Sequence, residues 1–301
     1  MKRLFPLILI LLLLLCACGG AEQETTTVSV LKSHESTSYW SEGNDFLSGV
    51  SGTWQSVYEY DDRGNQIEEK HYSGDELFTT RRWRYDDRGN QVAQTTIDHQ
   101  SLLPKITSRA KMRYNEEGKL ILQIVYEPWK ETQRSIYTYD ELGNMTRLEI
   151  RNAGGITVIQ DYTYDDRGNC LSTTDHSVEG FTRTTYYIYD DAGRQLSWHY
   201  YENDMLVEYV ESHYDDRGRV IFSARYDGQG NQKHTWEYRY NEAANTSATQ
   251  YTDGSISTTY YDDQGRTIRI EQQYPDGTLE SEQTYTYEDI EVLTTPTGGK
   301  P

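Results

Sequence analysis

Short stretches in which large and polar residues alternate are separated along the chain by residues that favour tight turns. One such stretch is Tyr162-Thr163-Tyr164, followed by Asp165-Asp166-Arg167-Gly168. The two tyrosines lie on one face of a strand, because strand side chains alternate between the two faces of a sheet. Asp favours the first turn position and Gly tolerates the left-handed conformation that closes a three-residue hairpin loop. The stretch therefore predicts a strand that ends in a hairpin turn.

The same stretch recurs along most of the chain. Its second tyrosine, or the equivalent residue, lies at Tyr60, Tyr85, Tyr114, Tyr139, Tyr164, Tyr189, Tyr214, Tyr240, Tyr261 and Tyr287. Five of the nine intervals between neighbouring copies are 25 residues long. A period this regular indicates a repeat architecture.

Each repeat contains the signals for two strands and two turns. An aliphatic residue usually lies three positions after the turn glycine and marks a return strand: Ile67, Val92, Ile121, Leu171, Leu196, Ile221 and Ile268. A second turn lies in the middle of the repeat, as at Asp227-Gly228, Asp253-Gly254 and Asp276-Gly277. The array then has on the order of twenty strands, which is more than a flat open sheet usually carries. We expect the sheet to curl or spiral.

The repeated Tyr-x-Tyr-Asp-x-x-Gly core resembles the YD repeats of the Rhs and WapA type, which are also found in teneurins. The resemblance covers residues from Tyr58 to Tyr287. It implies an all-β fold, in which antiparallel β-hairpin repeats of about 25 residues form an extended, curved or spiralling sheet. It also implies an association with carbohydrate binding.

Three copies depart from the repeat pattern. Asn115-Glu116-Glu117-Gly118 is a mild variant, and Asn241-Glu242-Ala243-Ala244 lacks the glycine. In the last copy, Tyr287-Glu288-Asp289, the motif stops early. The second departure predicts a distorted turn and the third predicts a terminal cap.

The N-terminal residues predict a lipoprotein. Residues 1–17 resemble a signal peptide, because Lys2 and Arg3 precede an apolar run that is short for a membrane span. The lipobox Leu15-Cys16-Ala17-Cys18 predicts cleavage before Cys18 and lipid on its thiol. Several acyl chains, palmitate among them, would anchor the chain stably to the membrane. We therefore expect an extracytoplasmic protein, lipid-anchored to the bacterial membrane or cell surface; an ordinary secretory signal is the alternative. The sequence does not distinguish a Gram-positive from a Gram-negative envelope.

The remaining chain divides by composition. Residues 18–27 predict a flexible tether, 28–57 a degenerate N-terminal capping repeat, 58–290 the repeat domain and 291–301 a disordered tail. Once Cys16 is removed and Cys18 is lipidated, Cys170 is the one cysteine left. No intramolecular disulfide is then available.

Composition limits the classes of partner. The chain is 35% hydrophobic, against a typical 45–50%, yet it contains 27 tyrosines. Its net charge of −19 argues against nucleic-acid binding, which needs a basic surface. Low hydrophobicity is typical of disorder, but tyrosine-rich strands bounded by turns oppose that interpretation.

Paired aspartates recur at the turns and suggest a row of carboxylates along one edge of the sheet. The pairs are Asp61-Asp62, Asp86-Asp87, Asp165-Asp166, Asp190-Asp191, Asp215-Asp216 and Asp262-Asp263. We consider Asp165, Asp166, Asp190, Asp191, Asp215 and Asp216 as a Ca²⁺-binding edge, because Ca²⁺ takes six to eight oxygen ligands. The alternative is that the first Asp caps its turn and the second is solvated. No other cofactor is expected.

Aromatic residues are the second candidate for function. Trp83, Trp129, Trp198 and Trp236 could stack on sugar rings. The alternative is that most rings form the packed face of the sheet. The seven histidines show no zinc-ligand spacing, and neither a Gly-x-Ser-x-Gly elbow nor a phosphate-binding glycine loop is present. We therefore do not expect an enzyme.

These observations favour a non-enzymatic binding or adhesion module whose ligand is a glycan or a cell-surface protein. Two alternatives stay open: a structural scaffold component, and an accessory partner of a larger Rhs-type system.

Overall fold

The computed structural model describes residues 25–38, 52–101, 103–127, 129–152, 155–176 and 180–293. These residues form a single 20-stranded antiparallel β-sheet. The predicted all-β fold of antiparallel hairpins is therefore confirmed. The predicted signal peptide, Cys18 and the end of the tail lie outside the described residues. Within the described part of the chain, no helix has both the length and the hydropathy to cross a bilayer.

The strands are β1 (Thr25–Ser38), β2 (Thr53–Tyr60), β3 (Gln66–Ser73), β4 (Glu76–Tyr85), β5 (Gln91–Asp98), β6 (Lys105–Tyr114), β7 (Leu120–Glu127), β8 (Lys130–Tyr139), β9 (Met145–Asn152), β10 (Gly155–Tyr164), β11 (Cys170–His176), β12 (Thr182–Tyr189), β13 (Gln195–Glu202), β14 (Met205–Tyr214), β15 (Val220–Asp227), β16 (Gln232–Asn241), β17 (Thr246–Tyr251), β18 (Ile256–Tyr261), β19 (Thr267–Gln273) and β20 (Leu279–Leu293).

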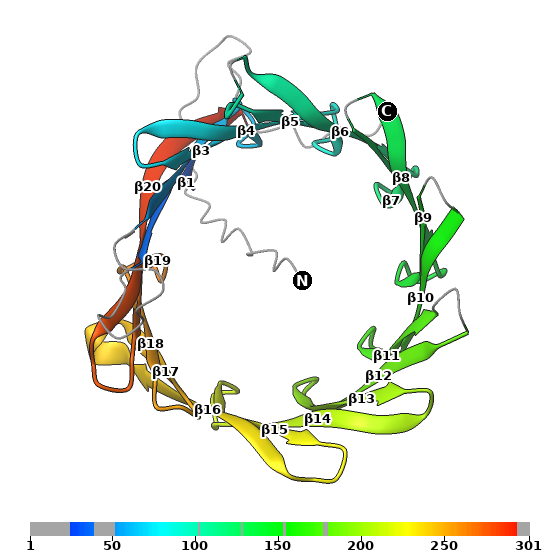
Figure 1. The fold of residues 1–301 in the computed structure, drawn as a ribbon, viewed down its shortest axis with the longest axis vertical. Coiled ribbons are helices and arrows are strands. Elements are labelled where there is room, and N and C mark those ends of the chain that lie inside the picture. Colours follow the sequence, from blue (N-terminus) through cyan, green and yellow to red (C-terminus); the bar gives the residue numbers. More distant parts are fainter. Residues whose placement is uncertain are drawn as a thin grey trace, which may run out of the picture.

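The sheet closes into a barrel, which Figure 1 shows as a ring of strands. Each strand pairs with its neighbours in sequence, and β1 also pairs with β20, from Thr25 opposite Leu293 to Ser38 opposite Ser281. The predicted open, spiralling sheet is wrong. An even number of antiparallel strands lets the first and last strands pair antiparallel, and closure removes the two free edges that an open sheet would expose.

The seam between β1 and β20 is tied to the first hairpin. The Tyr60 hydroxyl donates to the Leu31 carbonyl at 2.8 Å, and the Leu293 N–H donates to the Asp62 carbonyl at 2.7 Å. Val292 is buried in the seam. The range 28–57, for which we predicted a capping repeat, thus contributes strands that are paired on both sides. The last copy of the motif, which stops early after Tyr287, does not form a turn, because β20 continues through these residues and pairs with β1.

The turns have the predicted conformation. In one copy the Asp165 N–H donates to the Asn169 carbonyl, the Gly168 N–H donates to the Asp165 carbonyl, and Gly168 has a φ of 84°. One Asp165 carboxylate oxygen, Oδ1, accepts from the N–H groups of Arg167 and Asn169 at 2.9 and 2.8 Å. This is a three-residue loop closed by a glycine in the left-handed region, where a Cβ would be strained.

The repeated tyrosines connect each hairpin to the one before it. Their hydroxyls donate at 2.7–2.9 Å to the carbonyl of the first residue of the preceding return strand: Tyr85 to Gln66, Tyr114 to Gln91, Tyr139 to Leu120, Tyr164 to Met145, Tyr189 to Cys170, Tyr214 to Gln195, Tyr240 to Val220 and Tyr287 to Thr267. Burial raises the pKa of these hydroxyls, so they remain protonated donors at neutral pH. The contact is kept where the interval differs from 25 residues, as at Tyr114, because the hydroxyl reaches the start of the return strand rather than a residue at a fixed spacing.

The face of the sheet that carries these tyrosines is called the tyrosine face, and the other is the opposite face. Few hydrophobic side chains among the described residues are fully buried: Val30, Ala110, Val210, Ala224 and Val292. Most strand residues on both faces are half-buried or exposed. The low hydrophobic content of the chain therefore matches a single-layer wall whose two faces are held by hydrogen bonds and rings.

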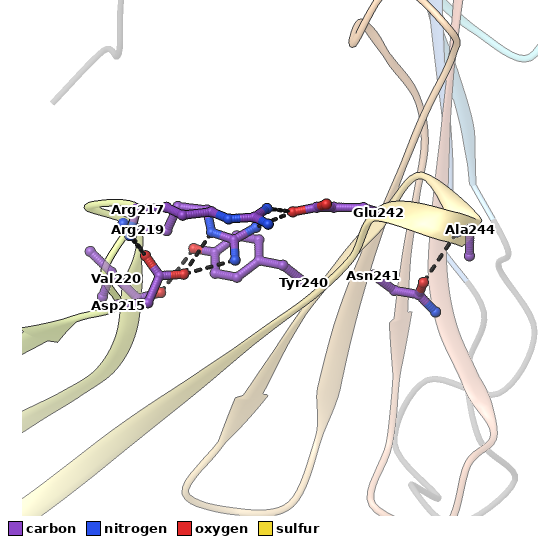
Figure 2. Close-up of polar contacts among 8 residues, drawn as sticks. All are labelled: Asp215, Arg217, Arg219, Val220, Tyr240, Asn241, Glu242 and Ala244. Carbon is purple, nitrogen blue, oxygen red and sulfur yellow. Dashed lines mark hydrogen bonds and ion pairs between the residues drawn. The ribbon is translucent and has the colours of Figure 1, made fainter.

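The copy without a turn glycine is distorted, as predicted. A short 3₁₀ helix, η1 (Glu242–Ala244), joins β16 to β17. The Asn241 side chain caps η1 by accepting from the Ala244 N–H at 3.1 Å, and Asn245 takes the left-handed conformation. Figure 2 shows this turn beside the preceding one.

Candidate functional site

Four aromatic side chains form a row on the opposite face across β12 to β15. Tyr186, His199, Tyr209 and Tyr226 lie directly opposite one another on successive strands, so they share a face. The His199 and Tyr209 rings stack with centroids 5.2 Å apart, and Tyr209 and Tyr226 stack at 4.8 Å. Tyr186 is 50% exposed. We call this set the aromatic row; it offers ring faces to a ligand.

A second surface on the opposite face carries positive charge. Arg84, Ala93 and Lys111 lie side by side on β4, β5 and β6, and the next row consists of Arg82, Thr95 and Arg109. We call these six residues the cationic groove. Five of them, all except Lys111, line a cavity of about 470 Å³, which Glu59 and Glu68 line as well. Ala93 and Thr95 of β5 lie between Arg82 and Arg84 of β4 and Arg109 of β6, the three cations that line the cavity. Lys111 lies next to Arg109 on the same face of β6.

The charges in the cationic groove are only partly balanced. Arg82 pairs with Glu68 at 2.6 Å, and Lys70 binds the same carboxylate. Burial of Glu68 opposes its ionisation, but the hydrogen bonds from Lys70 and Arg82 prevail and lower its pKa. Arg84 and Lys111, both exposed, have no carboxylate within ion-pair distance among the residues that the structure describes.

The four predicted stacking tryptophans do not form one site. Trp129 is 70% exposed in the turn between β7 and β8, and the Arg109 guanidinium lies 4.3 Å from its ring centroid. Trp83, Trp198 and Trp236 are half-buried and lie on the tyrosine face. Trp54, which was not among the four, is 48% exposed. Two of the four therefore lie at the cationic groove: Trp129 contacts Arg109, and Trp83 lines the cavity.

The paired aspartates are divided between two roles. The first member of each pair accepts hydrogen bonds within its own turn, and in Asp190 and Asp215 these bonds, first of all the one from the backbone N–H of Arg194 or Arg219, lower the pKa. The second members, Asp166, Asp191 and Asp216, are exposed. Within the described ranges, no group of three or more His, Cys, Asp or Glu side chains is arranged to hold a metal ion.

A smaller cavity of about 360 Å³ lies at the distorted turn. Arg217 pairs with Glu242, Arg219 contacts Glu242 and Asp215 at 3.3 and 2.7 Å, and the Arg219 guanidinium lies 4.3 Å from the Tyr240 ring (Figure 2). Because these charges satisfy one another, the cluster ties the distorted turn to the preceding one.

Sequence reasoning missed both the aromatic row and the cationic groove. The signal that could have found them is parity. Tyr186 and Tyr209 lie at an odd number of residues from the repeat tyrosines Tyr189 and Tyr214, and so does Arg84 from Tyr85. Side chains at odd spacing point to the other face of a strand. An aromatic or cationic residue at such a position is not part of the repeat motif, and it is therefore a candidate for a role specific to this protein.

Comparison with protein families gives one match. A family model with the description "Uncharacterised protein" matches residues 19–180, just over half of the chain. The prediction that the chain is a YD-repeat protein of the Rhs and WapA type is therefore wrong, because the matching model is that of another family. No curated protein matches the chain.

Several solved structures are similar to this barrel. A porin-like protein from Bacteroides uniformis is 9% identical, with 86% of this chain and 96% of that chain covered and a TM-score of 0.38. A porin-like protein from Bacteroides vulgatus is 12% identical, with 59% of this chain and 93% of that chain covered and a TM-score of 0.32. A structure described as TcdB2-TccC3 is 12% identical, with 89% of this chain and 20% of that chain covered and a TM-score of 0.32. The chain thus spans about a fifth of the length of that relative.

Proposed function

We propose that this chain, which belongs to the family matched over residues 19–180, is a non-enzymatic glycan-binding module held at the bacterial cell envelope by acylated Cys18. The observation that carries the proposal is the aromatic row. Stacked rings at positions that the repeat does not require have no part in the tyrosine contacts that connect the hairpins.

The aromatic row has the dimensions and chemistry of a sugar-binding surface. Neighbouring strands lie about 4.8 Å apart, so four rings on adjacent strands extend over roughly 14 Å. Aromatic rings present an apolar face, and tyrosine and histidine add a polar edge that hydrogen-bonds to hydroxyl groups. Trp129 adds a further exposed ring on the barrel.

The proposal is tested by binding of the full-length chain, solubilised in detergent, to a broad glycan array with and without Ca²⁺. We expect hits that the Tyr209→Ala variant loses, because Tyr209 stacks on both of its neighbours. Tyr274→Ala is the matched control: Tyr274 is a half-buried tyrosine before β20, outside the aromatic row. Hits that need Ca²⁺ would restore the aspartate edge as a site.

A blank array under both conditions would contradict glycan binding, and the surface-protein and scaffold hypotheses would then be tested by cross-linking at the cell surface. The hypothesis of an Rhs-type partner depended on the YD-repeat resemblance and is not carried further.

The anchor has its own test. We expect labelled palmitate to be incorporated into the wild-type chain and into Cys16→Ser, but not into Cys18→Ser. Labelling of the Cys18→Ser variant would contradict the anchor, whatever the array shows.

A further inference from the structure

Three exposed cations that lie on one face of β4 and β6 have no carboxylate partner among the described residues. With 48 acidic and 29 basic residues, most strand arginines find a carboxylate, as Arg147 does in Asp161 and Arg225 in Glu208. Arg84 and Lys111 have none among the described residues, and the same holds for Arg113, the next residue of β6 on this face. Clustered like charges repel one another and raise the energy of the free protein. An anionic ligand would relieve that repulsion.

The cationic groove has the geometry of a site for an extended anion. Its walls, β4 and β6, lie about 10 Å apart, since one strand separates them, and its successive rows lie about 7 Å apart along the strands. The cations therefore form a grid and do not converge on one point. A guanidinium pairs bidentately with a carboxylate, and an ammonium supplies a point charge beside it. The cavity volume lies within the range of about 300–1,000 Å³ that is typical of ligand sites.

The end of the groove carries a ring that would fit a sugar. The Arg109 guanidinium stacks on Trp129, which leaves the other face of the indole in solvent. A ligand chain that follows the groove would meet cations along its length and an aromatic ring at its end. Carboxylates and pyranose rings in alternation are the chemistry of an acidic polysaccharide.

Nucleic acid fits this surface less well. Its binding neutralises many successive phosphates, and the affinity comes from a continuous basic track. Here carboxylates on the same face limit the cationic surface, since Glu59 and Glu68 line one side of the cavity itself and Glu131 lies beyond its other side on β8. The excess of negative charge over the rest of the chain would repel a longer polyanion.

We infer that the cationic groove binds the carboxylates of an acidic polysaccharide, an inference that rests on the proposed glycan-binding function and names the class of glycan. Arg84 and Lys111 are the residues that would contact the carboxylates, and Trp129 would stack on a sugar ring.

The test is titration of the full-length chain with oligogalacturonate and with its methyl-esterified form, which keeps the sugar rings and removes the charge. We expect binding of the acidic form, weakened by salt, and a loss of about tenfold or more in affinity in Arg84→Gln/Lys111→Gln, since two charge-assisted contacts are removed. Lys32→Gln/Lys105→Gln removes the same charge outside the groove and should retain affinity within about twofold.

Three results would overturn the inference. The first is equal binding of both forms with no effect of the groove variant, which leaves the proposed glycan binding standing. The second is tighter binding of an oligodeoxythymidine than of oligogalacturonate. The third is the absence of binding to either form: the glycan array then decides whether glycan binding as a whole fails or only its acidic class.

Discussion

The two faces of the barrel wall are built from the same strands but follow different rules. On the tyrosine face, one contact is repeated from hairpin to hairpin, a tyrosine hydroxyl on the carbonyl of the preceding return strand. On the opposite face of the described strands, no hydrogen bond recurs from hairpin to hairpin in this way. Cations gather on β4 and β6, and aromatic rings gather on β12 to β15.

Residues on the tyrosine face hold the barrel together, whereas the cationic and aromatic clusters on the opposite face are features that the repeat does not account for. The repeated contact attaches one hairpin to the next along most of the barrel; at Tyr261, after the distorted turn, the hydroxyl bonds to the Ser247 side chain instead. Residues that break the repeat make no such contribution, so a ligand is the simplest reason for their clustering. The comparison predicts that variants on the tyrosine face change stability and that variants on the opposite face change binding.

The largest expected effect comes from removing a tyrosine-face ring. Tyr139→Ala loses the bond to Leu120 and the ring beneath Lys119, and should lower the free energy of unfolding by about 3 kcal/mol. Thr138→Ala, one residue away on the opposite face and exposed, should stay within about 0.5 kcal/mol. Urea denaturation measures both. Equal losses would show that the two faces do not differ in this way.

A turn glycine should have a smaller effect. Gly168→Ala forces a Cβ into the left-handed region at a φ of 84°, and should cost about 1–2 kcal/mol. Asp166→Ala in the same turn is the control, since Asp166 is exposed and the hydrogen bonds that close the turn are made by Asp165, Gly168 and Asn169. If both variants unfold at the same urea concentration as the wild type, the left-handed glycine is not needed for the hairpin.

Removing a single hydroxyl should cost less. Tyr189→Phe keeps the ring but leaves the Cys170 carbonyl without its donor, at about 1 kcal/mol. Tyr186→Phe removes an exposed hydroxyl from the same strand on the opposite face, and we expect no measurable change in stability. Thermal unfolding compares the two. If Tyr186→Phe loses more stability than Tyr189→Phe, the hydroxyl on the tyrosine face is not the one that stabilises the barrel.

The contribution of the turn aspartates to stability should be lost at acidic pH. The hydrogen bond from the Asn169 side chain, followed by those from the turn backbone, lowers the pKa of Asp165 from its ordinary value of 3.8. A carboxyl whose folded pKa is lowered stabilises the fold above its unfolded pKa, and that contribution disappears as the pH falls through the folded pKa. Stability should therefore fall below about pH 4, with a weaker dependence in Asp165→Asn than in Asp166→Asn. Identical pH profiles would contradict this role.

The repeat unit could be predicted from sequence because its determinants are local. Tyr162-Thr163-Tyr164 shows the alternation of a strand, and Asp165 and Gly168 supply the turn chemistry within four residues of it. The copy at Asn241 shows the same principle in reverse, since the missing glycine predicts the distortion that η1 makes.

Closure could not be predicted in this way. Closure depends on the pairing of β1 with β20. The curvature that brings Thr25 beside Leu293 is a property of the whole sheet and cannot be predicted from a short stretch of sequence. The cationic groove was missed for a related reason, because Arg84 and Lys111 meet only when the register of three strands is known. The repeat pattern also suggested the wrong family, since turn and strand chemistry are shared by unrelated hairpin proteins.

The most direct test of the account is to measure stability and glycan affinity together in two variants, Tyr139→Ala on the tyrosine face and Tyr209→Ala on the opposite face. We expect Tyr139→Ala to lower the unfolding midpoint while its folded fraction binds as the wild type does. We expect Tyr209→Ala to lose binding with a smaller change in midpoint. If Tyr209→Ala binds as the wild type does, or if both variants lose binding only in proportion to lost stability, the division between the two faces is wrong.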